Sequence, residues 1–161
     1  FSVVHNGEIS SYDANRRYIE MFGYKCNLQT DTEVITYIID FLLRVKHLTL
    51  EEVAKVISAS FWTTISDKSE EDRRQEIFLR KAFPSLLING PFSIIFGFSG
   101  GLMALNDRLK LRSMVCAEKG SLAFVSSEEC GIRVIQPELD NIFAPAGGQP
   151  VIFTMREGAE R

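Results

Sequence analysis

The sequence is poor in the residues that build metal and disulfide sites. It has three cysteines and two histidines in 161 residues, and no two cysteines form a CxxC pair. A structural zinc site takes four nitrogen or sulfur ligands at close spacing, so we expect no metal site. An odd number of scattered cysteines also argues against a disulfide framework and favours the reducing cytoplasm. We therefore expect a cytoplasmic protein in which Cys26, Cys116 and Cys130 are structural.

The sequence also has no excess of basic residues and no long apolar run. Eighteen Lys and Arg stand against twenty-one Asp and Glu, a net charge of −3, and no basic block is present to bind a phosphate backbone. The longest apolar candidate, residues 34–45, is interrupted by Asp40 and Arg44 and is too short for a membrane span. These shortages exclude nucleic acid and membrane as partners. With 45% hydrophobic and 24% charged residues, the composition is that of one soluble globular domain.

The first half of the chain predicts one strand followed by helices. Residues 1–4 favour a strand, and the Asn-Gly pair within residues 5–8 predicts a turn directly after it. Capping residues ahead of apolar positions at helical spacing predict four helices. We expect them from Ser10 or Ser11 to Gly23, after the capping boxes Thr30–Glu33 and Thr49–Glu52, and from about Ser69 to Ala82 before Pro84.

The second half predicts antiparallel strands. Residues 91–98 and 102–105 are rich in β-formers and flank a Ser-Gly-Gly turn, which indicates a hairpin. Helices first and a meander afterwards indicate an α+β layered domain. Further strands are expected at residues 113–117, 121–125, 133–135 and 151–155, and the polar tail 156–161 is expected to fray.

Three residues are candidates for chemistry. The Asn6-Gly7 pair, taken alone, is typical of a turn, but a side-chain amide beside an unencumbered backbone N–H can also form an oxyanion hole. Asp31 stands in the first turn of a helix, where its charge favours the helix dipole. Because Thr30 already supplies the cap, the Asp31 carboxylate is free to bind an ammonium group of a ligand.

The order of these residues resembles a known family. VVHNGEI around Asn6 is followed, 25 positions later, by TDTEV around Asp31. This arrangement is similar to the class II, N-terminal-nucleophile glutamine amidotransferase domain of amidophosphoribosyltransferase, glucosamine-6-phosphate synthase and glutamate synthase. The resemblance runs from Val3 to about Gln136. It continues through Gly90–Phe96, Leu105–Arg108, Leu111–Arg112 and Ser126–Glu128.

The resemblance implies a four-layer αββα sandwich of two antiparallel sheets. It also implies hydrolysis of glutamine to glutamate and ammonia, which passes to a synthase domain or subunit. In this interpretation Asn6 (side-chain amide) and Gly7 (backbone N–H) are catalytic, as the oxyanion hole. Asp31 binds the α-ammonium group of glutamine. The reaction requires no metal and no organic cofactor.

The chain departs from the family at its start. The family's nucleophile is an N-terminal cysteine whose α-amine acts as the base, whereas this chain begins with Phe1. The arginine that clamps the glutamine carboxylate has no counterpart ahead of Asn6, and Ser113 replaces a proline of the family. We therefore expect residues 1–161 to be a single amidotransferase domain that is N-terminally incomplete and inactive alone. A missing N-terminal segment would complete it, and would pair with a sheet edge that is otherwise open.

Three interpretations remain open from the sequence. The first is a glutaminase domain, with a glutamate-synthase-like subunit favoured. The second is a non-catalytic amidotransferase-like module that binds an amino acid or assembles with a synthase, and the third is an unrelated α+β domain with a chance Asn-Gly turn. Outside the motifs, we expect Phe61 and Trp62 to pack in the core or an interface, and Asp107-Arg108 to form a turn salt bridge.

Overall fold

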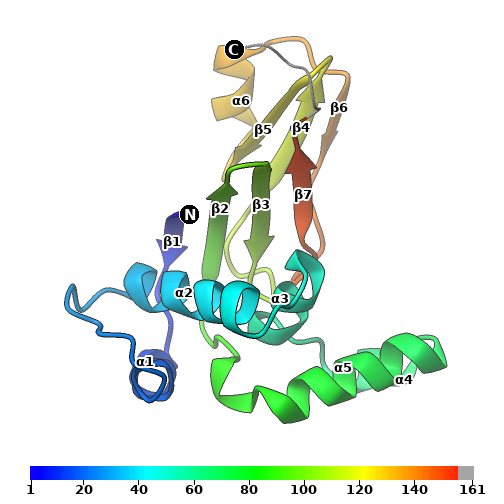
Figure 1. The fold of residues 1–161 in the computed structure, drawn as a ribbon. Helices are drawn as coiled ribbons and strands as arrows, with labels where there is room; N and C mark the ends of the chain where they lie inside the picture. The colour runs from blue at the N-terminus through cyan, green and yellow to red at the C-terminus, as the bar shows by residue number, and fades with distance from the viewer. Residues whose placement is uncertain (156–161) are drawn as a thin grey trace.

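The computed structural model describes residues 1–155, so the expected fraying of residues 156–161 lies outside the described part. Two antiparallel sheets organise the fold (Figure 1). The larger sheet has the order β1-β2-β3-β7 and the smaller one β5-β4-β6. The strands are β1 Ser2–Gly7, β2 Phe92–Phe98, β3 Gly101–Asn106, β4 Val115–Lys119, β5 Leu122–Ser126, β6 Asn141–Phe143 and β7 Val151–Thr154.

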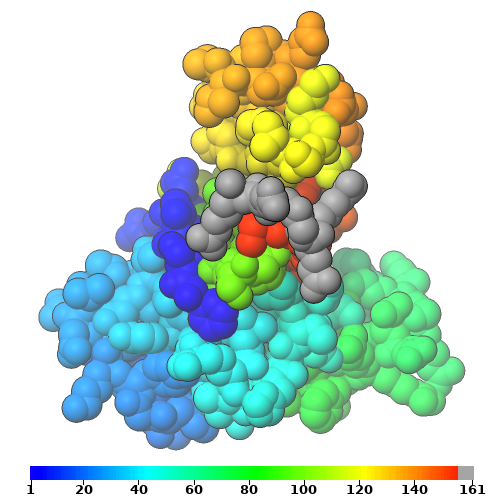
Figure 2. All heavy atoms as spheres, turned by 45° about the horizontal axis from the view of Figure 1, so that its top comes forward, coloured from blue at the N-terminus to red at the C-terminus, as the bar shows by residue number. Residues whose placement is uncertain are grey.

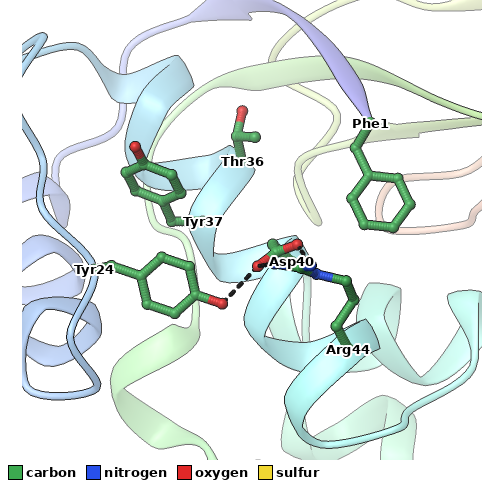
Figure 3. Close-up of a pocket in the computed structure, with 6 residues that line it drawn as sticks. All are labelled: Phe1, Tyr24, Thr36, Tyr37, Asp40 and Arg44. Carbon is green, nitrogen blue, oxygen red and sulfur yellow. Dashed lines mark hydrogen bonds and ion pairs between the residues drawn. The ribbon is translucent and has the colours of Figure 1, made fainter.

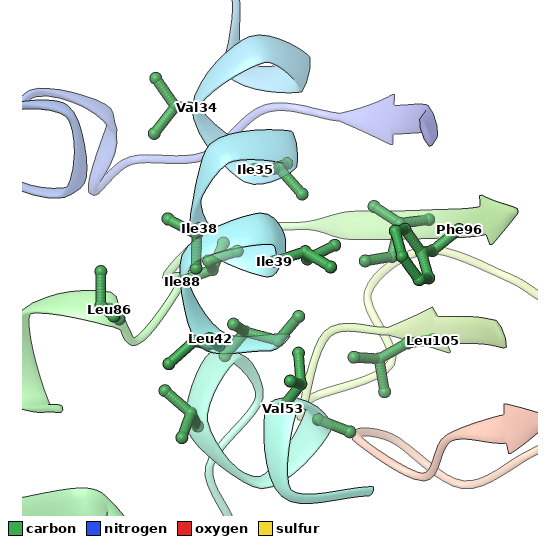
Figure 4. Close-up of a cluster of buried hydrophobic side chains, with 14 of the residues drawn as sticks. Val34, Ile35, Ile38, Ile39, Leu42, Val53, Leu86, Ile88, Phe96 and Leu105 are labelled. Carbon is green, nitrogen blue, oxygen red and sulfur yellow. The ribbon is translucent and has the colours of Figure 1, made fainter. Parts of the chain in front are cut away.

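Helices cover one face of the larger sheet. The contact is made chiefly by α2 and the π-helical turn that follows it, whose aliphatic residues from Val34 to Leu42 recur at helical spacing and are 0% exposed. Figure 4 shows Ile39 directed from α2 toward Phe96 of β2. The helices are α1 Tyr12–Glu20, α2 Asp31–Asp40 with a π-helical turn Phe41–Val45, α3 Leu50–Ile57, α4 Trp62–Ser66, α5 Glu70–Ala82, a 3₁₀ turn Pro84–Leu86, and α6 Glu129–Ile135.

The smaller sheet packs on the other face of the larger one. Ala104 of β3 and Val151 of β7 contact Met114 and Cys116 in a second, smaller hydrophobic cluster. In Figure 2 the yellow and orange residues of the smaller sheet stand at one end of the blue-to-green helical body. Because α6 packs against β5, the order of layers is helix, sheet, sheet, helix. The expected αββα sandwich is confirmed.

Most of the expected elements are present, and two expectations are wrong. The hairpin of β2 and β3 and the helices α3 and α5 are confirmed. Residues 133–135, expected as a strand, are the last turn of α6, where Arg133 pairs with Glu129 one turn earlier. The Asn-Gly pair is not a turn but lies inside β1, because the Glu8 N–H donates to the Pro91 carbonyl (3.0 Å) and extends the ladder past Gly7.

Candidate active site

Neighbouring residues of β1 face opposite sides of the sheet. Val3 and His5 are partly covered, whereas Val4 and Asn6 are exposed. Val3 packs against the helical core, so by strand alternation His5 shares the helix-facing side. The Asn6 side chain therefore lies on the face that packs against the smaller sheet, at the part of this face where β1 remains exposed.

Gly7 occupies a position that excludes any side chain. A Cβ there would lie 2.1 Å from the Pro91 carbonyl oxygen and 2.8 Å from the Phe92 Cα. Since Glu8 directs its N–H toward β2, the alternation of an antiparallel ladder directs the Gly7 N–H away from β2. β1 is an edge strand among the described residues, so this N–H faces the open edge of the sheet, next to Asn6.

Asp31 joins the start of α2 to the same end of β1. Thr30 caps the helix by accepting the Glu33 N–H (3.3 Å), and the Asp31 Oδ2 accepts the Ile9 N–H (2.9 Å), two residues beyond Gly7. The Asp31 Oδ1 accepts no hydrogen bond from residues 1–155. One oxygen thus fixes the carboxylate beside β1, and the second is left to receive a ligand's donor.

His5 is a residue of this region that the sequence reasoning missed. Burial lowers its pKa below the usual 6.5, against the opposing effect of the Asp31 carboxylate, while the Arg112 guanidinium adds to the lowering. Its Nε2 is buried and has no hydrogen-bond partner in the described residues. His5 is therefore neutral at pH 7. If VVHNG is interpreted as one continuous strand, alternation places the His5 ring on the helix-facing side of the sheet, where Asp31 lies.

Asp107 holds the loop after β3 against the start of β2. It is 3% exposed, and its carboxylate accepts the backbone N–H groups of Phe92 (3.3 Å), Leu111 (3.0 Å) and Arg112 (3.2 Å). The turn salt bridge expected with Arg108 is absent among residues 1–155, because backbone donors occupy Asp107. The Arg108 guanidinium instead donates to the Asn89 Oδ1 (3.1 Å).

Phe61 and Trp62 do not pack in the core. They are 40% and 53% exposed, and an arginine lies over each ring. The guanidinium carbon of Arg108 lies 4.8 Å from the Phe61 ring centroid, and that of Arg80 lies 4.2 Å from the Trp62 centroid. The expected core position is therefore wrong, and the expected interface position stays a prediction.

The internal thiols are poorly suited to act as nucleophiles. Burial raises the pKa of Cys116 to about 11 and also raises that of Cys26. Cys130 is exposed, but its hydrogen bond to the Glu128 carboxylate (3.2 Å) raises its pKa as well. Because the thiolate is the reactive form, these values agree with the expectation that the three cysteines have structural roles.

A cavity of about 450 Å³ lies at the other end of α2, away from Asp31. Its polar centre is Asp40, which accepts hydrogen bonds from the Tyr24 hydroxyl (2.6 Å) and the Arg44 guanidinium (2.8 Å to Nη2) (Figure 3). The Arg44 hydrogen bond lowers the pKa of Asp40, while burial, aided by Asp40, raises that of Tyr24 to about 12. Phe1 forms the opposite wall. The sequence reasoning missed this cavity, since Tyr24 and Asp40 meet only through tertiary packing.

Two classes of site are not seen in the described residues. No group of three or more His, Cys, Asp and Glu side chains is placed to hold a metal ion within residues 1–155. Over the same range, every helix is too short or too polar to cross a membrane. The roles of Asn6, Gly7 and Asp31 stay predictions, although the structure brings Gly7 and Asp31 to the same end of β1.

Comparisons with known proteins agree with this architecture. No family model matches the chain. It is 47% identical over 156 residues to an uncharacterised protein of Archaeoglobus fulgidus, covering 97% of this chain and 41% of that protein. It is 29% identical over 138 residues to the glutamine–fructose-6-phosphate aminotransferase (isomerizing) of Vibrio vulnificus, covering 81% of this chain and 21% of the enzyme. The chain thus spans less than half of either relative.

A solved structure defines the class of fold. Glutamine phosphoribosylpyrophosphate amidotransferase from B. subtilis superposes with a TM-score of 0.63 at 17% identity, over 94% of this chain and 26% of that one. Together with the two antiparallel sheets and the outer helices, this match shows that the chain has a class II glutamine amidotransferase-like fold. The α+β N-terminal-nucleophile sandwich expected from the sequence is therefore confirmed.

Proposed function

We propose that this chain is the larger, C-terminal part of a glutaminase domain that releases ammonia from glutamine. The observation that carries the proposal is the end of β1. Among residues 1–155, the Gly7 N–H faces the open sheet edge beside Asn6, and one Asp31 oxygen accepts no hydrogen bond. Two hydrogen-bond donors and one carboxylate lie at one end of an edge strand, with Asn6 and Asp31 on opposite faces of it, so a bound glutamine would span the open edge between them. Relatives named for their use of glutamine support this proposal.

The mechanism is acyl transfer. An N-terminal cysteine thiol attacks the side-chain amide carbon of glutamine, with its own α-amine as the base. The Asn6 Nδ2 and the Gly7 N–H donate hydrogen bonds to the oxyanion that develops. Ammonia leaves as the tetrahedral intermediate collapses, and water then releases glutamate from the thioester. Asp31 holds the α-ammonium group throughout, so it stabilises the ground state and the transition state equally.

Two partners complete this function. A segment preceding Phe1 supplies the cysteine and a carboxylate-binding arginine, and pairs with the open edge of β1. A synthase domain or subunit receives the ammonia, in keeping with relatives that are longer than this chain. The glutamate-synthase-like subunit expected from the sequence stays a prediction about that acceptor.

The test is ammonia release from glutamine by a polypeptide extended through the reading frame before Phe1. We expect an N-terminal cysteine in that frame, measurable glutaminase activity, and its loss when the cysteine is replaced by alanine. Residues 1–161 alone are the matched control and should be inactive. An extended protein that binds glutamine in calorimetry but releases no ammonia would overturn the glutaminase in favour of the non-catalytic module.

A further inference from the structure

Asn106, the last residue of β3, is a buried amide without a partner. Its exposed fraction is 0%, and neither its Nδ2 nor its Oδ1 has a hydrogen bond from residues 1–155. Its backbone carbonyl accepts a hydrogen bond from the Ser58 hydroxyl (3.3 Å). Burying an unpaired amide costs folding free energy, and such a group calls for an explanation.

The sheet register places Asn106 in a row with the proposed oxyanion donor. Asn6 pairs directly with Ser93 of β2, and Ser93 pairs directly with Asn106 of β3. Directly paired residues project to the same face of a sheet, so these three polar side chains form one line across three strands. We call Asn6, Ser93 and Asn106 the polar row.

Ladder geometry brings the inner two members of the polar row close together. The Asp107 N–H donates to the Phe92 carbonyl (2.8 Å), which makes that pair a hydrogen-bonded one. The next pair, Ser93 and Asn106, is therefore non-hydrogen-bonded, the kind whose side chains approach most closely. Their Cβ atoms are then about 4.5–5.5 Å apart, a separation that a serine hydroxyl and an asparagine amide can bridge.

Resting on the proposed glutaminase function, we propose that Asn106 is a positioning residue that orients Asn6 through Ser93. In the glutamine-bound protein the Asn106 Nδ2, which has no partner in the described structure, turns to donate to the Ser93 Oγ, and the Ser93 hydroxyl donates in turn to the Asn6 Oδ1. An exposed asparagine can otherwise rotate its amide and present Oδ1, which repels a negative oxygen. With Oδ1 held by Ser93, the Asn6 Nδ2 stays directed at the oxyanion.

The first experiment measures glutaminase kinetics in the extended, cysteine-bearing polypeptide. Asn106→Leu, close in volume but apolar, should lower kcat about tenfold with KM unchanged, because orientation matters only where charge develops. Ser93→Ala should have the same effect, and Ser93→Thr, which keeps the hydroxyl, should restore kcat. Ser2→Ala, on the same face of β1 but opposite Gly97, is the matched control and should leave kcat unchanged.

Thermal unfolding separates positioning from a structural role. Asn106→Leu also removes the unpartnered Oδ1, so its melting temperature should equal or exceed that of the wild type. A loss of kcat without a loss of stability supports positioning. A lowered melting temperature together with unchanged kcat would show a structural role and overturn the proposal.

A double variant tests the coupling directly. If Asn106 acts only through Asn6, then Asn6→Ala combined with Asn106→Leu should be no slower than Asn6→Ala alone. If the two losses in kcat multiply in the double variant, the proposal is overturned.

The single variants distinguish a failure of the proposed function from a failure of the polar row. If Asn6→Ala leaves kcat unchanged, the oxyanion assignment of the proposed function fails. If Asn6→Ala lowers kcat and Asn106→Leu does not, only the polar row fails.

Discussion

The helices α2 and α3 begin with the same sequence signature but use it differently. At α3, Thr49 and Glu52 form a reciprocal capping box, with the Glu52 N–H on Thr49 (3.2 Å) and the Thr49 N–H on Glu52 (2.9 Å). At α2, Thr30 accepts the Glu33 N–H. The buried Glu33 carboxylate, however, accepts N–H groups of the preceding loop, from Asn27 (2.9 Å) and Leu28 (2.8 Å).

The difference shows how a common cap can be adapted to position a site. The box at α3 caps its own helix, and its Glu52 carboxylate also accepts the Gln75 Nε2 of α5 (2.9 Å), so it links two helices and no candidate site residue. At α2, Glu33 binds the loop that leads into the helix, while Asp31 binds the chain just after β1. The start of α2 is therefore held on two sides, and the Asp31 carboxylate has a fixed place at the end of β1. Substitutions at the starts of α2 and α3 should show whether a cap residue helps to hold Asp31 or only stabilises the helices.

Glu33→Ala should give the largest difference between the two helices. It removes two charge-assisted hydrogen bonds and leaves two loop N–H groups without their acceptor, a loss of roughly 3 kcal/mol in the free energy of unfolding. Glu52→Ala, at the matching position of α3, removes one cap hydrogen bond and the contact with Gln75, and should cost about 1.5 kcal/mol. Urea denaturation measures both. Equal losses would contradict the supporting role of Glu33.

Asp31→Ala, measured in the extended polypeptide, should raise the KM for glutamine about thirtyfold, which corresponds to about 2 kcal/mol. Its kcat should change little, because the ammonium contact exists in both the ground state and the transition state. Leu50→Ala, the first residue of α3, is the control and should leave KM unchanged. A fall in kcat alone would remove the substrate-binding role from Asp31.

Thr49→Ala and Thr30→Ala test the part that the two caps share. Each should lower the free energy of unfolding by about 1 kcal/mol, because each leaves one helix N–H without its acceptor. Only Thr30→Ala should also raise the KM, since it loosens the helix turn that holds Asp31. If both variants have a normal KM and kcat, the α2 cap does not help to hold Asp31 in place.

His5→Gln should give the smallest effect, seen only in pH dependence. The pKa of His5 is lowered in the folded protein, so the unfolded chain binds its proton first as the pH falls below about 6.5. The wild type should therefore lose stability between neutral and mildly acidic pH, and His5→Gln should reduce that slope. The difference in melting temperature between pH 7.5 and pH 5.5 measures this slope for each protein. An unchanged slope would mean that His5 is not held neutral by burial.

Local signals in the sequence predicted much of the fold. The hairpin of β2 and β3 follows from β-forming residues around a Ser-Gly-Gly turn, and α5 from its serine cap and the proline that follows. The short elements α4 and β6 were not expected. Each has five or fewer residues and depends on packing rather than on its own periodicity.

The candidate residues Asn6, Gly7 and Asp31 could be named from the sequence, whereas their geometry could not. Asn6 and Gly7 were identified as a turn, and the ladder with β2 overrides that preference. Glu33 and Asp107 could not be predicted as loop anchors, because the backbone groups they bind are brought to them by tertiary structure. The polar row depends on the register of three strands. Sequence patterns do not fix the register between β1 and β2, because 84 residues of helices and loops (residues 8–91) separate these strands.

The turnover number of Asn6→Ala in the extended polypeptide tests the central claim most directly. Loss of one oxyanion donor should lower kcat about 100- to 1,000-fold, with the KM for glutamine within about threefold of the wild type. That result would place the Asn6 amide at the developing negative charge. An unchanged kcat in a correctly folded variant would contradict the account.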